Sequence, residues 1–354
     1  MIESDALVAG TGPAGALAAL ELARAGFRVV IAGGVGATSP KIGESLPGVG
    51  LRLLRSLRID DSEFGTVHRR IGGNLSCWSS EDLDATDFFC NPDGPGWRLS
   101  RHRFDACLLS AATAAGVTHI PFHVDTVVRN RGVWEARLKS DDSVVSRWLV
   151  DATGRNSVLA RKLGITRIRD RGLAALYSFG SSQRAETFDR TLIEAVPEGW
   201  WYGAVLPEDK GLLVLHVRPQ DARVVRREWS EAVDRTRFIR EFFPRVGFRE
   251  HVSVTDAGGS RLQSFNGSNW VACGDAAMSF DPLSSQGIYT AMYSGLSAAR
   301  AIIASEGGDL SALPDYARRL DDIGRVYRAR LTSSYGLVRR WQNAPFWIEA
   351  GSTR

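Results

Sequence analysis

Two glycine-rich motifs carry the residue types and spacing that a nucleotide site needs, and they lie far apart in the chain. The first is V-A-G-T-G-P-A-G at residues 8–15, and the second is G-D-A-A-M-S-F-D-P-L-S-S-Q-G-I at residues 274–288. Either motif alone is weak evidence, because glycine-rich turns also occur for purely structural reasons. Their order and separation predict a nucleotide-binding fold that the chain leaves and later returns to complete.

The first motif has the G-x-G-x-x-G spacing that suits a pyrophosphate. One glycine allows a tight turn, one lets the phosphates approach the backbone, and one lets a helix pack closely on a strand. The apolar run at residues 6–9 predicts that strand, and residues 14–25 predict a helix whose first N–H groups face the phosphates. The residues expected to bind the nucleotide here are Gly10, Gly12, Pro13, Ala14 and Gly15.

The usual acidic ligand of the nucleotide ribose is missing. Such a residue is expected about 20 residues after the motif, at the end of the second strand. That strand is predicted at residues 28–32, and the chain continues with Gly33 and Gly34. The ribose must therefore be held in another way, through backbone or water, and the departure disfavours a plain NAD-binding dehydrogenase.

Composition places the chain among ordinary globular proteins. It has 354 residues, of which 44% are hydrophobic and 24% charged, enough for one large domain or two intertwined domains with a substantial core. No apolar run is long enough for a membrane span, and a strand predicted within the first few residues leaves no room for a signal peptide. The net charge of +4 comes from scattered basic residues, which does not suit nucleic-acid binding.

Cysteines and histidines give no sign of a metal site. The four cysteines form no C-x-x-C pair, and a reduced, cytoplasmic setting suits them. The six histidines are dispersed without metal-ligand spacing. We therefore expect no bound metal ion.

Hydrophobic periodicity predicts alternating blocks of helix and strand. Helices are expected at residues 49–57, 101–115, 229–243, 284–304 and 315–341. Alternating residues predict sheet at 70–98 and through most of 172–260, and three short strands at 123–129, 132–138 and 144–149 that form a meander. A further strand is expected to end in V-D-A-T-G at residues 150–154.

Four more motifs complete a family resemblance. They are K-I-G-E-S-L-P at residues 41–47, Arg101 ahead of Phe104 and Asp105, D-A-T-G-R at 151–155, and W-W-Y-G-A-V-L-P at 200–207. Over nearly its full length the chain resembles FAD-dependent monooxygenases of the p-hydroxybenzoate-hydroxylase-like superfamily. Within that superfamily it is most similar to the branch that holds tryptophan-halogenase-like and LodB-like flavoproteins.

The resemblance implies an α/β fold with discontinuous domains. Residues 1–75, 98–165 and 262–325 are expected to form a Rossmann-like FAD-binding domain of the glutathione-reductase type. A β-sheet substrate-binding domain, from residues 76–97 and 166–261, is interleaved with it. Residues 326–354 form a carboxyl-terminal helix and tail, whose aromatic residues are expected to face the core.

The resemblance also implies roles for residues around the flavin. Asp275 contacts the ribityl chain, Arg101 lies beside the flavin, and Pro282 and Gly287 face the isoalloxazine. A helix amino terminus here favours the negative charge that reduced flavin carries at N1. A simple turn at Asp275 and a surface ion pair at Arg101 are the alternatives. The further cofactor-binding residues are Glu44, Ser45, Gly154, Gly274, Ser285, Gln286 and Ile288.

Catalytic and substrate residues are expected on two segments. The loop at residues 41–47 runs under the flavin in related sequences, so Glu44 and Lys41 join Pro282 as catalytic candidates. Trp200, Trp201 and Tyr202 are consecutive, and their side chains alternate between the faces of a strand. One face is expected to line the substrate cavity, with a packed sheet as the alternative. Asp281 is expected either at the site or only as a helix cap.

The implied reaction is hydroxylation of an electron-rich aromatic compound through a flavin C4a-hydroperoxide. It consumes O2, and NAD(P)H or a separate flavin reductase supplies the electrons. The LodB-like relatives imply a tryptophan of a partner protein, hydroxylated during quinone-cofactor maturation. A small aromatic or indolic metabolite is the alternative substrate. No general base stands out by spacing.

Three other activities remain to be distinguished from hydroxylation. Flavin halogenases use a lysine a few tens of residues after the G-E loop, but residues 69–97 contain none and the W-x-W-x-I-P signature is absent. Halogenation is therefore disfavoured. A flavin-dependent reductase of the geranylgeranyl-reductase type would need a long apolar tunnel. A flavin-binding protein without turnover is kept open by the missing ribose acid.

Overall fold

Two large sheets divide the computed structural model, which describes residues 1–34, 42–88, 91–181, 188–243 and 251–351. The first has eight strands, and its central path runs β19-β20-β11-β1-β2-β8. The neighbours from β20 to β8 are all parallel, and β9 and β10 extend the sheet as an antiparallel pair beside β11. Its strands are β1 (Ile2–Ala9), β2 (Val29–Ala32), β8 (Thr118–Ile120), β9 (Val124–Asn130), β10 (Val133–Leu138), β11 (Ser143–Asp151), β19 (Asn266–Gly267) and β20 (Trp270–Ala272).

Register in this sheet brings three distant loops to one edge. Ala9 at the end of β1 pairs with Asp151 at the end of β11, and Asp151 pairs with Ala272 at the end of β20. In parallel sheets, ligands bind in the crevice beyond the carboxyl ends of the strands. The chain therefore presents Gly10, Gly154 and Gly274 at the edge where a nucleotide is expected.

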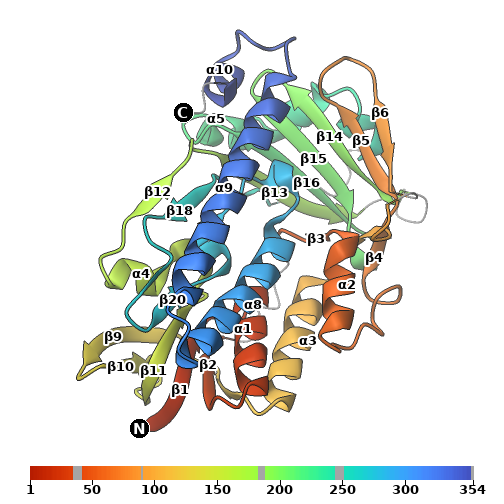
Figure 1. Ribbon diagram of the computed structural model, residues 1–354. Coiled ribbons are helices and arrows are strands. Elements are labelled where there is room, and N and C mark those ends of the chain that lie inside the picture. The colour runs from red at the N-terminus through yellow and green to blue at the C-terminus, as the bar shows by residue number, and fades with distance from the viewer. Residues whose placement is uncertain (35–41, 89–90, 182–187, 244–250, 352–354) are drawn as a thin grey trace.

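Four helices run side by side against this sheet (Figure 1). They are α1 (Pro13–Arg24), α3 (Arg101–Ala114), α8 (Gly287–Glu306) and α9 (Ala312–Gly336). α1 packs against both α3 and α8. A Cβ atom at Gly295 of α8 would lie 2.2 Å from the carbonyl oxygen of Ala14. Only glycine therefore lets α8 approach α1 this closely, and that contact joins the two ends of the chain.

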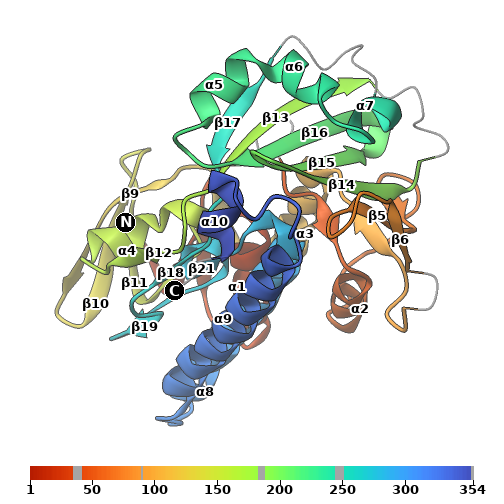
Figure 2. The same ribbon diagram turned by 90° about the horizontal axis from the view of Figure 1, so that it is seen from above.

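The second large sheet has seven strands in the order β17-β13-β16-β15-β14-β5-β6. Three short helices, α5 (Ala222–Arg227), α6 (Trp229–Asp234) and α7 (Ile239–Phe242), cover its outer face (Figure 2). The end of α9 and α10 (Pro345–Gly351) pack on its inner face. Its strands are β5 (Gly73–Cys77), β6 (Asp84–Asp87), β13 (Ala174–Ser181), β14 (Arg190–Val196), β15 (Gly199–Val205), β16 (Lys210–Val217) and β17 (Ser253–Asp256).

Two three-stranded sheets join the halves. One has the order β3-β7-β4 and the other β12-β18-β21. Their strands are β3 (Ser45–Leu46), β4 (Arg69–Ile71), β7 (Gly96–Arg98), β12 (Arg167–Arg169), β18 (Ser260–Leu262) and β21 (Met278–Ser279). The remaining helices are α2 (Gly48–Ser56) and α4 (Val158–Lys162). No helix in the described ranges is long and apolar enough to cross a membrane.

The α/β fold class with carboxyl-terminal helices is confirmed, and several element boundaries are corrected. The strand predicted at residues 144–149 and the strand predicted to end at residues 150–154 are a single strand, because β11 continues through Val150 to Asp151. The helix at the end of the second glycine-rich motif begins at Gly287 rather than residue 284, after a short 3-10 turn. β5 begins at Gly73, so the second sheet crosses the predicted domain boundary at residue 75.

A single helix at residues 229–243 is wrong, because a buried carboxylate interrupts it. α6 ends at Asp234, and α7 begins at Ile239. The Glu194 side chain on β14 accepts hydrogen bonds from the backbone N–H groups of Arg237, Phe238 and Ile239. Those N–H groups open a new helix on the carboxylate. A partner 43 residues away in the sequence leaves no local signal.

Candidate active site

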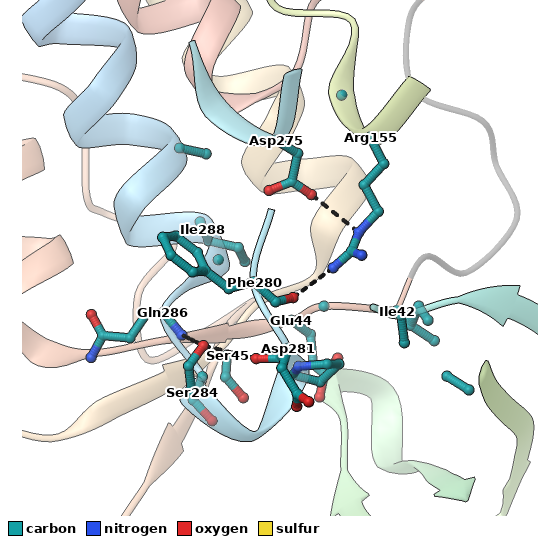
Figure 3. Close-up of a pocket in the computed structure, with 18 of the residues that line it drawn as sticks. Ile42, Glu44, Ser45, Arg155, Asp275, Phe280, Asp281, Ser284, Gln286 and Ile288 are labelled. Carbon is teal, nitrogen blue, oxygen red and sulfur yellow. Dashed lines mark hydrogen bonds and ion pairs between the residues drawn. The ribbon is translucent and has the colours of Figure 1, made fainter. Parts of the chain in front are cut away.

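One cavity lies where the carboxyl edge of the first sheet meets the inner face of the second. Its volume is ≈ 450 Å³, within the range of roughly 300–1,000 Å³ typical of small-molecule sites. Residues from both glycine motifs, from the 42–45 loop and from β15 and β16 line it. Figure 3 shows the Asp275, Glu44 and Gln286 segments converging around the same space. The structure thus gathers all six sequence motifs at one place.

The three glycines of the first motif differ in their surroundings. A Cβ atom at Gly15 would lie 1.9 Å from the Gly10 carbonyl oxygen, and one at Gly10 would lie 2.2 Å from the Ala152 carbonyl oxygen. A Cβ atom at Gly12 would meet nothing within 4 Å. Gly10 and Gly15 therefore allow close packing of β1, β11 and α1. Gly12, which lines the cavity with Pro13 and Ala14, leaves its backbone open to a ligand.

Asp275 reaches the cavity from the turn after β20 and is held by arginine. The Arg155 Nε atom lies 3.4 Å from Asp275 Oδ2, and about a third of each side chain is exposed. Arg155 also donates to the carbonyl oxygen of Phe280 at 2.8 Å (Figure 3) and to that of Gly258 at 2.8 Å. Burial raises the pKa of the Asp275 carboxyl, and the guanidinium groups of Arg155, Arg167 and Arg101 oppose that rise. The carboxylate is positioned to accept hydroxyl hydrogen bonds from a ligand.

Arg167 holds the same turn through its backbone, a role that no sequence motif predicted. It donates to the carbonyl oxygens of Asp275 and Ala276, at 2.9 and 3.0 Å. It also bonds the hydroxyls of Ser157, Ser260 and Ser279. Burial lowers the pKa of Arg167. The strand it lies on, β12, carries no motif, so only the fold reveals its contact with Asp275.

The position of the missing ribose acid is filled by backbone and two neighbouring side chains. Thr11 Oγ1 donates to the Gly34 carbonyl oxygen at 2.7 Å, and His119 Nε2 donates to the Gly33 carbonyl oxygen at 2.9 Å. These contacts fix the path of the chain after β2. Among the described residues no carboxylate stands there, so the prediction that the ribose is held by backbone or water remains.

Arg101 holds the 42–45 loop in place. Its Nη1 donates to the Gly43 carbonyl oxygen at 2.6 Å, and its Nη2 lies 3.2 Å from Asp105 Oδ2. Arg101 lines the cavity. The side chain is thus an internal tether with one edge on the cavity, rather than only a surface ion pair. Lys41 lies outside the described residues.

Glu44 lies in a buried polar network that the sequence did not reveal. Its Oε1 accepts a hydrogen bond from the Tyr202 hydroxyl, and Arg98 Nη1 lies 3.4 Å away. Arg98 also donates to Tyr202 and, at 2.8 Å, to Thr191 Oγ1. Glu44 and Arg98 are almost fully buried. Ser45 Oγ lies 3.3 Å from the Tyr202 hydroxyl, so the network runs from the loop to β15.

The loop from Asp281 to Ile288 forms the wall opposite β16. Asp281 Oδ1 accepts a hydrogen bond from the Leu283 N–H at 2.9 Å, which confirms Asp281 as a cap. Its Oδ2 accepts one from the Tyr335 hydroxyl at 2.8 Å. The cavity-lining residues of this loop and the helix it opens are Asp281, Pro282, Ser284, Ser285, Gln286, Gly287 and Ile288. The amino terminus of α8 thus points at the space where the flavin ring is expected.

The facing wall is the apolar inner face of the second sheet. Ala175, Leu212 and Val214 line the cavity, with His216 at the end of the row. Tyr202 pairs with Val214 across β15 and β16, and its hydroxyl adds a polar group to this wall. This wall therefore presents an apolar surface to the space between Val214 and Pro282.

Two predicted substrate residues, Trp200 and Trp201, do not line the cavity. Trp201 is 0% exposed and packs against Trp229 of α6, at 4.8 Å between ring centroids. Trp200 is 1% exposed, although it points to the same face as Tyr202. Its Nε1 donates to the Tyr335 hydroxyl at 3.0 Å. Helices cover both faces of the sheet at this point, so the indoles belong to its two cores.

The carboxyl-terminal aromatic residues face the core, as predicted. Tyr335, Phe346 and Trp347 are buried, and Trp347 Nε1 donates to the Val196 carbonyl oxygen at 2.8 Å. Trp78 joins them through edge contacts with Trp200 and Trp347. These residues pack behind the cavity. Of Trp200, Trp201 and Tyr202, it is Tyr202 that lines the cavity.

His216 makes stability depend on pH. Burial lowers its pKa to about 3, nearby Arg171 adds to the effect, and a backbone hydrogen bond with Trp200 opposes it. The unfolded chain takes up a proton near pH 6.5 while the folded ring stays neutral, so stability is complete above that pH and falls on acidification. Between pH 6.5 and 5, His216 is expected to account for a loss of about 2 kcal/mol in the free energy of unfolding.

Urea unfolding at pH 7.5 and pH 5 of the wild type and His216→Phe checks this expectation. The variant keeps a ring to stack on Trp200, which lies 3.7 Å away, and should lose about 2 kcal/mol less than wild type on acidification. His68, whose pKa burial lowers to about 4, acts in the same window in both proteins. The control is the same replacement by phenylalanine at the exposed His251. An equal loss in wild type and His216→Phe would contradict the assignment.

Comparisons with known proteins agree with this geometry. The FAD binding domain family matches residues 3–320. The FAD-dependent oxidoreductase LodB of Marinomonas mediterranea is 29% identical over 97% of this chain and 95% of its own length. A 1H-pyrrole-2-carbonyl-[peptidyl-carrier protein] brominase of Pseudoalteromonas luteoviolacea is 28% identical over 89% of this chain and 81% of its own.

Solved structures show the same fold. The flavin-dependent halogenase CmlS superposes with a TM-score of 0.88 at 22% identity, over 100% of this chain and 68% of that one. The peptidyl tryptophan dihydroxylase QhpG superposes with a TM-score of 0.82 at 22% identity, over 98% of this chain and 78% of that one. The chain belongs to the FAD binding domain family, and it is an FAD-dependent oxidoreductase.

Proposed function

We propose that this protein hydroxylates an electron-rich aromatic compound held between the bound flavin and the inner face of the second sheet. The observation that carries the proposal is the cavity itself, in which the flavin motifs form one wall and Ala175, Leu212 and Val214 form the other. An apolar wall suits an aromatic ring, and a dry site protects oxygen chemistry from water.

The residues present fit FAD. Gly12 and the amino terminus of α1 offer open N–H groups for the pyrophosphate, and Asp275 offers a carboxylate for the ribityl hydroxyls. Pro282 and Gly287 would flank the ring, where the dipole of α8 favours negative charge. Bound FAD supplies electron storage and the activation of O2. NAD(P)H or a separate flavin reductase would supply the electrons.

The chain's own contribution is to orient the substrate and handle a proton. Tyr202 presents its hydroxyl on the apolar wall, donating to Glu44 and accepting from Arg98. Burial raises the pKa of Tyr202 and the Glu44 carboxylate adds to the effect, although Arg98 opposes it. The phenol therefore stays protonated. Because its proton is donated to Glu44, its oxygen can accept a hydrogen bond from a polar group of the substrate. The Glu44 carboxylate behind it can take up a proton that passes through the hydroxyl.

The substrate we propose is an indole or tryptophan ring, carried either by a small molecule or by a partner protein. LodB is similar to this chain over nearly its whole length. QhpG, which has the same fold, acts on a peptidyl tryptophan. The likeness to QhpG favours a tryptophan-bearing partner, and the apolar wall accommodates the ring in either form.

Halogenation is a second candidate, because a brominase and several flavin-dependent halogenases are among the relatives. Against it, no lysine occurs in residues 69–97, and none is found among the described residues that line the cavity. Both reactions would use the same cavity and the same oxidant. They differ in the atom that reaches the ring.

Isotope labelling separates these candidates. The FAD-loaded protein is given an NADH-driven flavin reductase, ¹⁸O2, bromide and either indole, tryptophan or a tryptophan-containing peptide. Mass spectrometry should show a product that has gained one or two ¹⁸O atoms. A brominated product without ¹⁸O would establish the second candidate. Reoxidation of the flavin with every substrate left unchanged would contradict both.

Tyr202→Phe is expected to reduce turnover by about a hundredfold, because it removes the hydroxyl of the apolar wall that donates to Glu44. FAD affinity should change by less than about twofold, since Tyr202 lies on the substrate side. Steady-state product formation and flavin fluorescence titration measure the two effects.

Tyr177→Phe is the matched control for this variant. Tyr177 pairs with Val214 from the neighbouring strand β13, but it does not line the cavity. It should turn over at the wild-type rate. Equal turnover by Tyr202→Phe and the wild type would remove Tyr202 from the mechanism.

A further inference from the structure

A second cavity lies behind the Asp281–Ile288 loop, and the proposed reaction does not use it. Its volume is ≈ 440 Å³, close to that of the first. It is bounded by β12, β18 and α9, which lie close together in both views (Figures 1 and 2), and by Glu349 of α10. Asp281 lines both cavities, so the two are neighbours at this side chain.

The inner wall of this cavity carries a buried cation without a hydrogen-bond partner. All three guanidinium nitrogens of Arg171 lack a partner within the described part of the chain, and its side chain is 11% exposed. The group lies over the rings of both Tyr335 and Phe346, at 4.2 and 4.6 Å from their centroids. The nearest carboxylate oxygen, on Asp281, is 3.8 Å away. Arg171 thus adds positive potential to the wall, and its ion pair with Asp281 is a long one without a hydrogen bond.

Two further guanidinium groups reach the cavity from its more accessible side. Arg328 on α9 forms no hydrogen bond or ion pair with any described residue. Arg261 on β18 has only a 3.4 Å bond to a carbonyl oxygen and a 3.9 Å contact with Asp321. Both side chains therefore have unused N–H donors. Donors of this kind, set close together, are what carboxylate and phosphate groups bind.

The acidic residues of the cavity are outnumbered by its arginines. Glu349 is engaged by Arg218 at 3.0 Å, outside the arginine group. Asp281 is occupied by the Tyr335 hydroxyl and the Leu283 N–H. Burial raises the pKa of Asp170, while Arg328 and Arg261 oppose the rise. Four arginines, Arg169, Arg171, Arg261 and Arg328, thus line the cavity against three carboxylates, and the cavity keeps net positive charge.

We propose that this second cavity binds an oxyanion, either a carboxylate or a phosphate group. Arg261 and Arg328 would supply the hydrogen bonds, and Arg171 would supply field from behind. The proposal does not depend on the reaction in the first cavity, because every group that it uses lies on β12, β18, α9 or the segment that follows β12.

Calorimetric titration of the FAD-loaded protein with inorganic phosphate and, separately, with acetate tests the proposal. Low ionic strength keeps the charges unscreened. At least one anion should bind with one-site stoichiometry, and Arg328→Gln and Arg261→Gln should each weaken it by about tenfold or more. Binding of phosphate alone would point to a phosphate ester as the ligand, and binding of acetate to a carboxylate.

Two controls make the outcome decisive. Arg300→Gln removes an exposed arginine on α8 that pairs with Glu21, and it should bind like the wild type. Arg328→Lys keeps the charge and should bind more tightly than Arg328→Gln. Unchanged melting temperatures would show that the variants fold. Binding of neither anion, or equal binding by wild type, Arg261→Gln and Arg328→Gln, would overturn the proposal.

Discussion

Gly15→Ala is expected to destabilise the folded protein by about 3 kcal/mol, whereas Gly12→Ala should leave its stability unchanged. A Cβ atom at Gly15 would lie 1.9 Å from the backbone oxygen of Gly10, so α1 must move away from β1. The gain of about 1 kcal/mol in helix propensity is too small to compensate. At Gly12, with φ −73° and nothing within 4 Å, alanine fits without strain.

For FAD affinity we expect the opposite order, with Gly12→Ala the more damaging of the two variants, provided that Gly15→Ala folds. The methyl group of Gly12→Ala occupies the side from which the pyrophosphate approaches the backbone. Losing charge-assisted hydrogen bonds there should weaken FAD binding by roughly tenfold to a hundredfold. Urea unfolding of the apoprotein and titration by flavin fluorescence give the two quantities. Wild-type FAD affinity in Gly12→Ala would show that the phosphates bind elsewhere.

Arg98→Met is expected to destabilise the protein by about 3–5 kcal/mol, because it leaves the buried Glu44 carboxylate without its cation. Arg98 is 2% exposed, and its lost bonds include those to Tyr202 and Thr191. Methionine fills most of the same volume, so the cavity contribution should be small. Urea unfolding at neutral pH measures the loss.

An exposed ion pair and a double variant provide the controls for Arg98→Met. Arg147, half exposed and paired with Glu306, should cost at most about 1 kcal/mol when replaced by methionine. The double variant of Arg98→Met and Glu44→Met should recover at least about 2 kcal/mol, since neither charge is then left alone. If Arg98→Met is no worse than Arg147→Met, the Glu44 network contributes little to stability.

The first sheet and its ligand edge could be predicted from sequence because their signals are local. Gly10, Gly12 and Gly15 follow directly on a short apolar strand, and the spacing alone specifies a strand, a turn and a helix. The D-A-T-G and G-D motifs end two more strands in the same way. Parallel pairing then brings Gly154 and Gly274 to the same edge as Gly12.

The tertiary partners of these residues could not be predicted. Arg98 meets Glu44 through the pairing of β3 with β7, and Arg167 meets Asp275 through a strand without any motif. Alternation along β15 correctly predicted that Trp201 and Tyr202 lie on different faces of the sheet. It could not show that Trp200, on the same face as Tyr202, is covered by Tyr335 and Trp347. How far a helix covers a sheet depends on packing between distant segments.

The most direct test of the account is a crystal structure of the protein with FAD bound. The pyrophosphate should lie over Gly12 at the start of α1, and the ribityl chain within hydrogen-bond distance of Asp275. The isoalloxazine should lie against Pro282 and Gly287, with one face open toward Val214 and Tyr202. A flavin ring packed outside this cavity, or turned away from the apolar wall of the second sheet, would contradict the proposed reaction site.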